Sequence, residues 1–210
     1  MSTDVPTPPG SSATRIDPRR LRATLGGFAT GVTVVTYRDA GGAPRGATMN
    51  SFTSVSMEPP LILVSVAKQA KAAEGLRDRP FAVNVLAANQ LPLAMLFAGQ
   101  PVDGLTVPWC GPATAPPRMA GTAAWLECRP CATHEAGDHL IVIGEVIHHD
   151  SRPLEPLVFH RGEFRRPGLK LLRVPRSVAL DGAPFPDAVG RLHDLHALMD
   201  AGIDTEPLDA

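Results

Sequence analysis

Short polar side chains crowd the segment from residue 48 to residue 56, which reads TMNSFTSVS. The segment offers many hydrogen-bond donors at once, and it is followed by Pro59-Pro60 and the apolar stretch Leu61–Val66. A flavin ring needs donors at its pyrimidine edge and an apolar surface beneath its plane. The segment therefore predicts a flavin pocket, with Thr48, Met49, Asn50 and Ser51 at the pyrimidine edge. The alternative is that Asn50 and Ser51 only satisfy the backbone of a turn.

Strands on both sides are expected to position this segment. The stretch from Val32 to Tyr37 is β-branched and aromatic, Asp39-Ala-Gly-Gly supplies turn residues, and Arg45 to Met49 can return as the partner strand. This pattern predicts a hairpin that leads into the polar segment. Leu61 to Val66 is predicted as the strand that follows, with Ser65 and Val66 facing the same pocket.

Several separated motifs together resemble one known family. These are GFATGVTVVT at 27–36, NSFTSVSMEPP at 50–60, FAVNVL at 81–86, and AGDH at 136–139 followed by IVIGEV. They resemble the flavin reductase-like, FMN-binding split-barrel family over about Asp17 to Arg166, and within it the short reductase components of two-component flavin monooxygenases. The resemblance implies a mainly β protein with short helices, folded as an antiparallel, Greek-key-like split barrel and assembled as a homodimer. It also implies hydride transfer from NADH or NADPH to FMN or FAD, with the reduced flavin passed to a separate monooxygenase.

Composition is compatible with this resemblance and excludes some other classes. A chain of 210 residues with 44% hydrophobic residues can bury one sizeable core, and a net charge of −1 does not suggest nucleic-acid binding. No stretch is long enough to span a membrane, and the first residues contain no apolar signal-peptide region. Three cysteines do not form a disulfide framework, so we expect a cytoplasmic protein. Cys128 and Cys131 have CxxC spacing without a second pair, and we expect no metal site.

Three parts of the chain are expected. Residues 1–16 are predicted as a disordered lead, 17–166 as the flavin reductase-like domain, and 167–210 as an extension with one amphipathic helix over Asp187 to Ala201. In the domain, Asp17-Pro18 predicts the start of a helix that reaches Leu25, and Asn89 predicts the cap of another that ends at Gly99. Six or seven short strands are expected, enough for a closed antiparallel barrel. The later ones are predicted at Phe81–Leu86, Trp125–Cys131, His139–His149 and Leu157–Phe164, with a helix over 68–78 and a long loop over 100–121.

Two further residues are candidates for the flavin side. Asn84 is an amide in an otherwise apolar strand, and it either faces the pocket or makes hydrogen bonds in the core. Lys71 is flanked by Ala70 and Ala72 where the family usually carries hydroxyl residues around a basic one. The resemblance thus leaves Lys71 as a point charge for the flavin phosphate and indicates a flavin that is held loosely, as a substrate.

The nicotinamide side is assigned by the resemblance to His139, in Gly137-Asp138-His139, and to a second segment at His160, Arg161 and Gly162. The alternatives are that His139 has only a structural role and that Arg161 is a solvated surface residue. No acid, base or nucleophile is expected, because the two cofactors carry the hydride chemistry themselves. Two rival classes remain open at this point: an enzyme like pyridoxamine-phosphate oxidase, and a non-catalytic flavin-binding or regulatory module.

Overall fold

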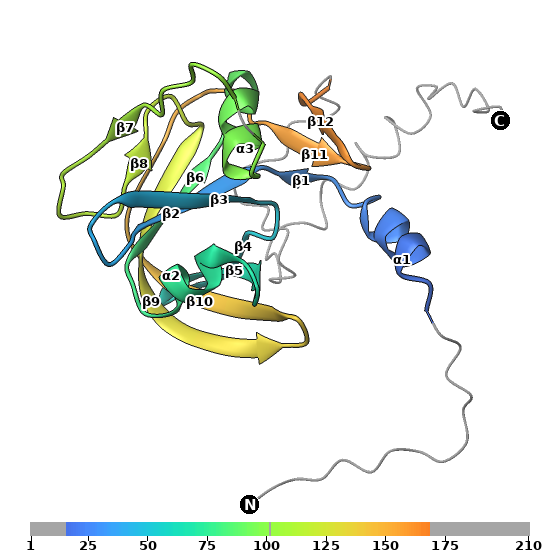
Figure 1. Ribbon diagram of the computed structural model, residues 1–210, viewed down its shortest axis with the longest axis horizontal. Coiled ribbons are helices and arrows are strands. Elements are labelled where there is room, and N and C mark those ends of the chain that lie inside the picture. Colours follow the sequence, from blue (N-terminus) through green and yellow to red (C-terminus); the bar gives the residue numbers. More distant parts are fainter. Residues whose placement is uncertain (1–15, 101, 169–210) are drawn as a thin grey trace, which may run out of the picture. The chain divides into compact units, whose positions relative to one another are not determined.

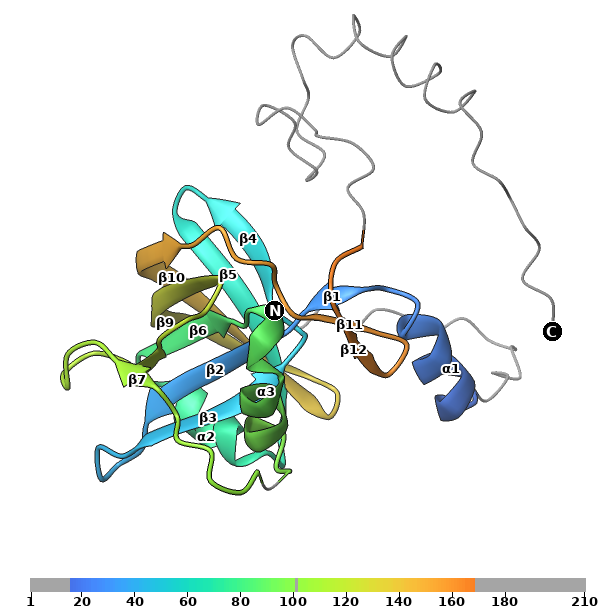
Figure 2. The ribbon, with the colours of Figure 1, turned by 90° about the horizontal axis from the view of Figure 1, so that it is seen from above.

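The computed structural model describes residues 16–100 and 102–168 (Figures 1 and 2). This part of the chain is mainly β, with few and short helices. The helices are α1 (Pro18–Leu25), α2 (Lys71–Arg77), the 3₁₀ turn η1 (Ala88–Gln90) and α3 (Leu91–Phe97). The strands are β1 (Thr30–Gly31), β2 (Thr33–Arg38), β3 (Pro44–Met49), β4 (Thr53–Met57), β5 (Pro60–Ala67), β6 (Phe81–Val85), β7 (Trp109–Cys110), β8 (Arg118–Met119), β9 (Ala124–Ala136), β10 (His139–Ser151), β11 (Val158–His160) and β12 (Glu163–Arg165).

The central layer is a seven-stranded antiparallel sheet in the order β3-β2-β6-β9-β10-β5-β4. Two small sheets, β1-β11-β12 and β7-β8, complete the described part. Figures 1 and 2 show the long β9–β10 hairpin curving strongly along its length. The sheet ends at β3 on one side and at β4 on the other, and no ladder joins these two strands. The closed barrel expected from the number of strands is therefore not formed as a continuous hydrogen-bonded cylinder.

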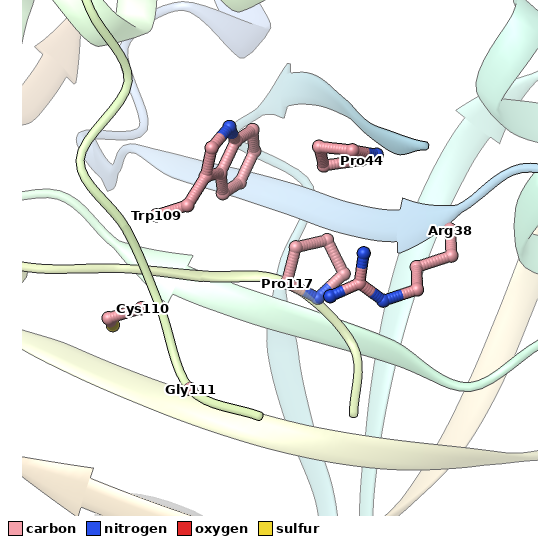
Figure 3. Close-up of a pocket in the computed structure, with 6 residues that line it drawn as sticks. All are labelled: Arg38, Pro44, Trp109, Cys110, Gly111 and Pro117. Atoms are coloured by element: carbon pink, nitrogen blue, oxygen red, sulfur yellow. The ribbon is translucent and has the colours of Figure 1, made fainter. Parts of the chain in front are cut away.

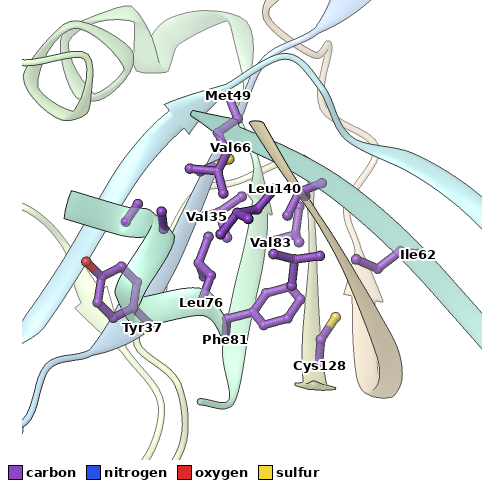
Figure 4. Close-up of a cluster of buried hydrophobic side chains, with 14 residues drawn as sticks. Val35, Tyr37, Met49, Ile62, Val66, Leu76, Phe81, Val83, Cys128 and Leu140 are labelled. Atoms are coloured by element: carbon purple, nitrogen blue, oxygen red, sulfur yellow. The ribbon is translucent and has the colours of Figure 1, made fainter. Parts of the chain in front are cut away.

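The main core lies on the concave side of this sheet and is covered by α2 (Figure 4). Along β5 the buried residues alternate, with Ile62, Val64 and Val66 in the core, as expected for a strand with one face covered. Gly75 of α2 is required by this packing, since a Cβ atom there would lie 2.0 Å from the ring of Tyr37. A second cluster forms where α3 packs against Val32, Val34 and Leu157.

Most of the elements expected from the sequence are present. The carboxylate of Asp17 accepts a hydrogen bond from the Arg19 N–H at the start of α1, which confirms this cap. The hairpin of β2 and β3, strands β5 and β6 and the β9–β10 hairpin are confirmed. The amphipathic helix predicted over 187–201 lies outside the described residues, and so does the lead predicted over 1–16 except for Ile16.

Three local predictions were wrong. The polar segment 48–56 does not only lie between strands, as expected, because Thr53–Met57 itself pairs with β5 as strand β4. The stretch from Leu157 to Phe164 is a hairpin of β11 and β12, which turns at Arg161-Gly162. Asn89 does not cap a helix: the Gln90 side chain accepts the hydrogen bond from the Ala87 N–H instead, and α3 begins only at Leu91. None of the helices in the described part is long and apolar enough to cross a membrane.

Candidate functional site

The segment between β3 and β4 presents backbone donors without partners. The N–H groups of Asn50, Ser51 and Phe52 make no hydrogen bond to any described residue. Asn50 is exposed, and the other two are half-buried. Free N–H groups grouped at one bend are the feature that a flavin edge requires, because they offer donors in a fixed geometry. The site therefore fits the predicted ligand through its backbone.

The side chain of Ser51 is engaged within the protein. Its Oγ donates a hydrogen bond to the Ser65 carbonyl oxygen at 2.7 Å and accepts one from the Ser65 N–H at 3.1 Å. A hydroxyl has a single proton to donate, so this contact uses it. The structure brings Ser51 and Ser65 together, as predicted, but it joins them to each other by their own hydrogen bonds.

Ser65 and Val66 do not face the same side of the sheet, contrary to the sequence prediction. Successive residues of a strand point to opposite faces. Val66 is 4% exposed and belongs to the core, whereas Ser65 is half-buried on the other face. Only the Ser65 side chain can face a ligand there, and Val66 contributes to the packing beneath. Figure 4 shows Val66 close to Met49 at one end of the core, where β5 and β3 converge.

Thr48 and Met49 hold the end of β3 in place. The hydroxyl of Thr48 donates to the Ala94 carbonyl oxygen of α3 at 2.6 Å. Met49 is buried, and its carbonyl oxygen accepts a hydrogen bond from the Thr33 hydroxyl at 2.8 Å. Both residues therefore fix the position from which the segment of free N–H groups begins.

Asn84 lies in the core, which decides between its two interpretations. It is fully buried on β6. Its amide nitrogen donates to the Val34 carbonyl and to the Thr36 hydroxyl, both at 3.0 Å, and its amide oxygen accepts from the Met119 N–H at 2.9 Å. These bonds pin the end of β8 onto the central sheet and leave no side-chain group for a flavin. The assignment of Asn84 to the flavin side is corrected accordingly.

Lys71 is the first residue of α2 and is exposed. Its side chain makes no ion pair within the described residues. Its carbonyl oxygen accepts a hydrogen bond from the Tyr37 hydroxyl, which anchors the backbone at this position. The ammonium group is therefore available to a ligand, and it lies a few residues after Ser65 on the same chain segment.

His139 begins β10 and pairs with Ala67 at the end of β5. Its Nδ1 lies 2.7 Å from the Asp138 carboxylate. The hydrogen bond from His139, together with the charge of that ring, lowers the pKa of the Asp138 carboxyl below its ordinary value. The Lys68 N–H donates to the Asp138 carbonyl, and the Lys68 ammonium pairs with Glu135 at 2.9 Å. The β9–β10 turn is thus tied to the loop after β5, which sequence analysis did not predict.

His160, Arg161 and Gly162 form the turn between β11 and β12. Arg161 and Gly162 both have positive φ, 50° and 82°, the geometry of a tight hairpin turn. The Arg161 N–H donates to the Gly26 carbonyl after α1 at 2.9 Å. No hydrogen bond or ion pair joins this turn to His139 within the described part of the chain. The two groups predicted for the nicotinamide side therefore belong to separate sheets.

A shallow, open depression of about 250 Å³ lies elsewhere, between the ends of β2 and β3 and the β7–β8 hairpin (Figure 3). None of the predicted site residues lines it. Its lining residues are Arg38, Pro44, Trp109, Cys110, Gly111 and Pro117. The CxxC pair is not arranged as one site either, because Cys128 is buried and Cys131 is exposed. Burial raises the pKa of the Cys128 thiol to about 12, so it stays protonated at neutral pH.

Comparison with known families decides the class. Residues 25–168 match the model described as the flavin reductase like domain, which is more than half of the chain. The chain belongs to this family. The matched range includes the segment of free N–H groups, the Ser51–Ser65 contact, Lys71, His139 and the β11–β12 turn, so the match covers the candidate site.

Individual relatives carry names that agree with the family. The chain is 44% identical over 156 residues to a probable flavin reductase from Rhizobium meliloti (strain 1021), covering 73% of this chain and 50% of the relative. It is 45% identical over 162 residues to an NADH-dependent FAD reductase from Streptomyces globisporus, covering 72% and 88%. It is 38% identical over 151 residues to the reductase component of a flavin-dependent trigonelline monooxygenase from Acinetobacter baylyi, covering 71% and 49%. The chain thus spans about half the length of two of these three relatives.

A solved structure shows the same fold. The flavin reductase PheA2 in its native state superposes with a TM-score of 0.70 at 36% sequence identity, covering 73% of this chain and 100% of that one. The residues after 168 lie outside the matched family model. The common fold is therefore carried by the part of the chain described here.

The buried position of Asn84 leads to a prediction about stability and flavin affinity. Asn84→Ala should lower the free energy of unfolding by about 2 kcal/mol, because it leaves the buried Met119 N–H unpaired. Flavin affinity of the folded variant should stay within about twofold of the wild type. Asn50→Ala, at an exposed position, is the control and should change stability by less than about 0.5 kcal/mol. Denaturant unfolding and flavin titration measure both quantities. Weaker flavin binding by Asn84→Ala at unchanged stability would return this residue to the ligand side.

Proposed function

We propose that this protein is an NAD(P)H-dependent flavin reductase that supplies reduced flavin to a separate flavin-dependent monooxygenase. The observation that carries the proposal is the group of free N–H donors at residues 50–52, in a chain of the flavin reductase like family. The names of the relatives, among them an NADH-dependent FAD reductase and a monooxygenase reductase component, support the nucleotide and the partner. The proposal includes both FMN and FAD as the flavin substrate.

The residues divide into roles by their positions. The N–H groups of Asn50, Ser51 and Phe52 hold the edge of the flavin ring, Ser65 faces it, and Thr48, Met49 and Val66 support this surface from behind. Lys71 pairs with the flavin phosphate. His139 orients the nicotinamide nucleotide, and His160, Arg161 and Gly162 bound that side of the site.

Hydride passes from C4 of the nicotinamide to N5 of the flavin when both are bound, and this chemistry needs no protein nucleophile. The protein contributes geometry. Fixed backbone donors orient the flavin edge, and Lys71 attracts the phosphate through a screened charge. The absence of hydroxyl residues beside Lys71 supports a flavin that binds and leaves as a substrate.

The split-barrel architecture and a homodimer are part of the proposal. Helix α1 has no buried residue, and Leu21, Leu25 and Phe28 are 44%, 65% and 78% exposed in the single chain. A second copy would cover such apolar side chains and complete the pocket. Light scattering should then give about twice the chain mass of 22.2 kDa. We also propose a cytoplasmic location, the domain boundaries at 17–166, and an extension over 167–210.

The proposed activity predicts rapid NADH or NADPH consumption when free FMN, FAD or riboflavin is added to the purified protein. A steady-state assay over the three flavins and two nucleotides measures this and selects the preferred pair. An enzyme like pyridoxamine-phosphate oxidase would instead carry tightly bound FMN and ignore added nucleotide. A non-catalytic module would bind flavin without consuming either nucleotide, and both outcomes would contradict the proposal.

The role of Lys71 predicts selective loss of phosphate binding. Lys71→Ala should weaken FMN and FAD about two- to fivefold, as expected for one exposed charge, and leave riboflavin unchanged because it has no phosphate. The effect should shrink at high salt. Arg77→Ala, at the other end of α2, is the matched control and should leave all three flavins unaffected. Flavin fluorescence titration tests this, and equal weakening of riboflavin and FMN would show that Lys71 supports only the fold of the loop.

The role of His139 predicts a change on the nucleotide side alone. His139→Ala should raise the KM for NADH about three- to tenfold, the effect of one lost hydrogen bond, with the KM for flavin unchanged. His134→Ala, an exposed histidine on β9, is the control and should behave as wild type. Steady-state kinetics with each substrate varied in turn measures both constants. If His139→Ala leaves both constants and kcat unchanged, His139 has only a structural role.

A further inference from the structure

Strand β5 is paired unequally along its two sides. Toward β10 it is paired from Leu61 to Ala67. Toward β4 the pairing runs only from Pro60 to Leu63, where Leu63 lies opposite Thr53. The N–H and C=O of Ser65 point to this second side, since both bond to Ser51 there. Ser65 therefore lies just beyond the end of the β4 ladder.

Ser51 occupies the next position of that ladder. In an antiparallel pair, residues that exchange both backbone bonds recur at every second position. Two residues back from Thr53 is Ser51, and two residues on from Leu63 is Ser65. The backbone of Ser51 does not make this exchange. Its Oγ accepts from the Ser65 N–H and donates to the Ser65 C=O, so one hydroxyl replaces both backbone groups.

This replacement has a direct consequence for the ligand side. In a regular ladder the Ser51 N–H would donate to the Ser65 carbonyl and would be unavailable. Because the hydroxyl takes that carbonyl, the Ser51 N–H is left without a partner among the described residues. The N–H groups of Asn50 and Phe52 beside it also lack partners there, because at alternate positions of an edge strand they would point away from β5. The chain can diverge from β5 at this point without leaving the Ser65 backbone unsatisfied.

We infer that Ser51 is a positioning residue for flavin: its hydroxyl takes the place of one backbone pair between β4 and β5 and so keeps the Ser51 N–H free, beside those of Asn50 and Phe52, for the edge of the flavin ring. The inference rests on the proposed function for the identity of the ligand. In this arrangement the Ser51 side chain bonds to β5, and the Ser51 backbone is free to bind the flavin. Loss of the Ser51–Ser65 contact should therefore weaken binding of the flavin ring and not of the phosphate.

The test compares three variants with the wild type. Ser51→Ala removes both hydrogen bonds and should raise the Kd of riboflavin, FMN and FAD by the same factor, about tenfold for two ordinary hydrogen bonds. The KM for NADH should stay unchanged. Ser51→Thr keeps the hydroxyl and should restore binding to within about threefold. Ser54→Ala removes an exposed hydroxyl of β4 that makes no side-chain hydrogen bond within the described residues, and it should match the wild type.

Hydrogen exchange of the flavin-free protein gives a second readout. The segment 60–67 should exchange faster in Ser51→Ala and at the wild-type rate in Ser54→Ala, because only the first variant exposes the Ser65 N–H. If Ser51→Ala does not fold, the near-isosteric Ser51→Cys takes its place, since a thiol is a poor donor and acceptor. A wild-type protein that reduces no flavin would refute the proposed function, while this exchange experiment would still decide the pairing.

Several results would overturn the inference. Faster exchange in Ser51→Ala with unchanged flavin affinity would make the contact purely structural. Weaker binding of FMN and FAD but not of riboflavin would place the effect at the phosphate. If flavin added to the wild type speeds exchange of segment 60–67, the flavin competes for the Ser51 hydroxyl, and Ser51 is a direct ligand.

Discussion

The backbone of β5 must be hydrogen-bonded on both sides, and the way its last residues meet this requirement shapes the whole site. A buried backbone group without a hydrogen bond destabilises a protein, so a strand that extends beyond its neighbour needs another hydrogen-bond partner. Here β4 ends opposite Leu63, and a side-chain hydroxyl serves Ser65. The chain between β3 and β4 is thereby released from the ladder at the point where free N–H groups are needed. The order of the sheet is open, with no ladder between β3 and β4.

The opposite side of β5 positions the second half of the site. The ladder with β10 places His139 beside Ala67, at the same end of the strand as Ser65. The polar contacts nearby, Lys68 with Glu135 and Asp138 with His139, are exposed, and solvent screens such contacts so that they add little to stability. Backbone pairing with β5 therefore fixes the location of His139, and the two exposed contacts contribute little to it. One strand thus relates the proposed flavin side to the proposed nucleotide side.

Local signals in the sequence predicted much of this. The Asp17-Pro18 helix start, the β2–β3 hairpin and the long β9–β10 hairpin follow from capping, turn and β-branched residues that act over a few positions. The polar segment before Pro59-Pro60 marked the candidate site, and strand alternation alone could have separated Ser65 from Val66. Asn84 could not be assigned because its partners, Val34 and Met119, are distant in sequence. The β11–β12 turn was missed because Arg161 is not glycine and yet adopts positive φ. Sheet closure depends on strand order, which no local pattern encodes.

We propose above all that the backbone N–H groups of residues 50–52 hold the edge of the flavin ring. Amide chemical shifts measured by NMR during titration with riboflavin test this contact, since riboflavin has a ring and no phosphate. We expect large shifts at Asn50, Ser51 and Phe52 and small ones at Lys71. Unchanged shifts at residues 50–52, with the main changes around Trp109 and Arg38, would contradict it and move the flavin to the depression beside the β7–β8 hairpin.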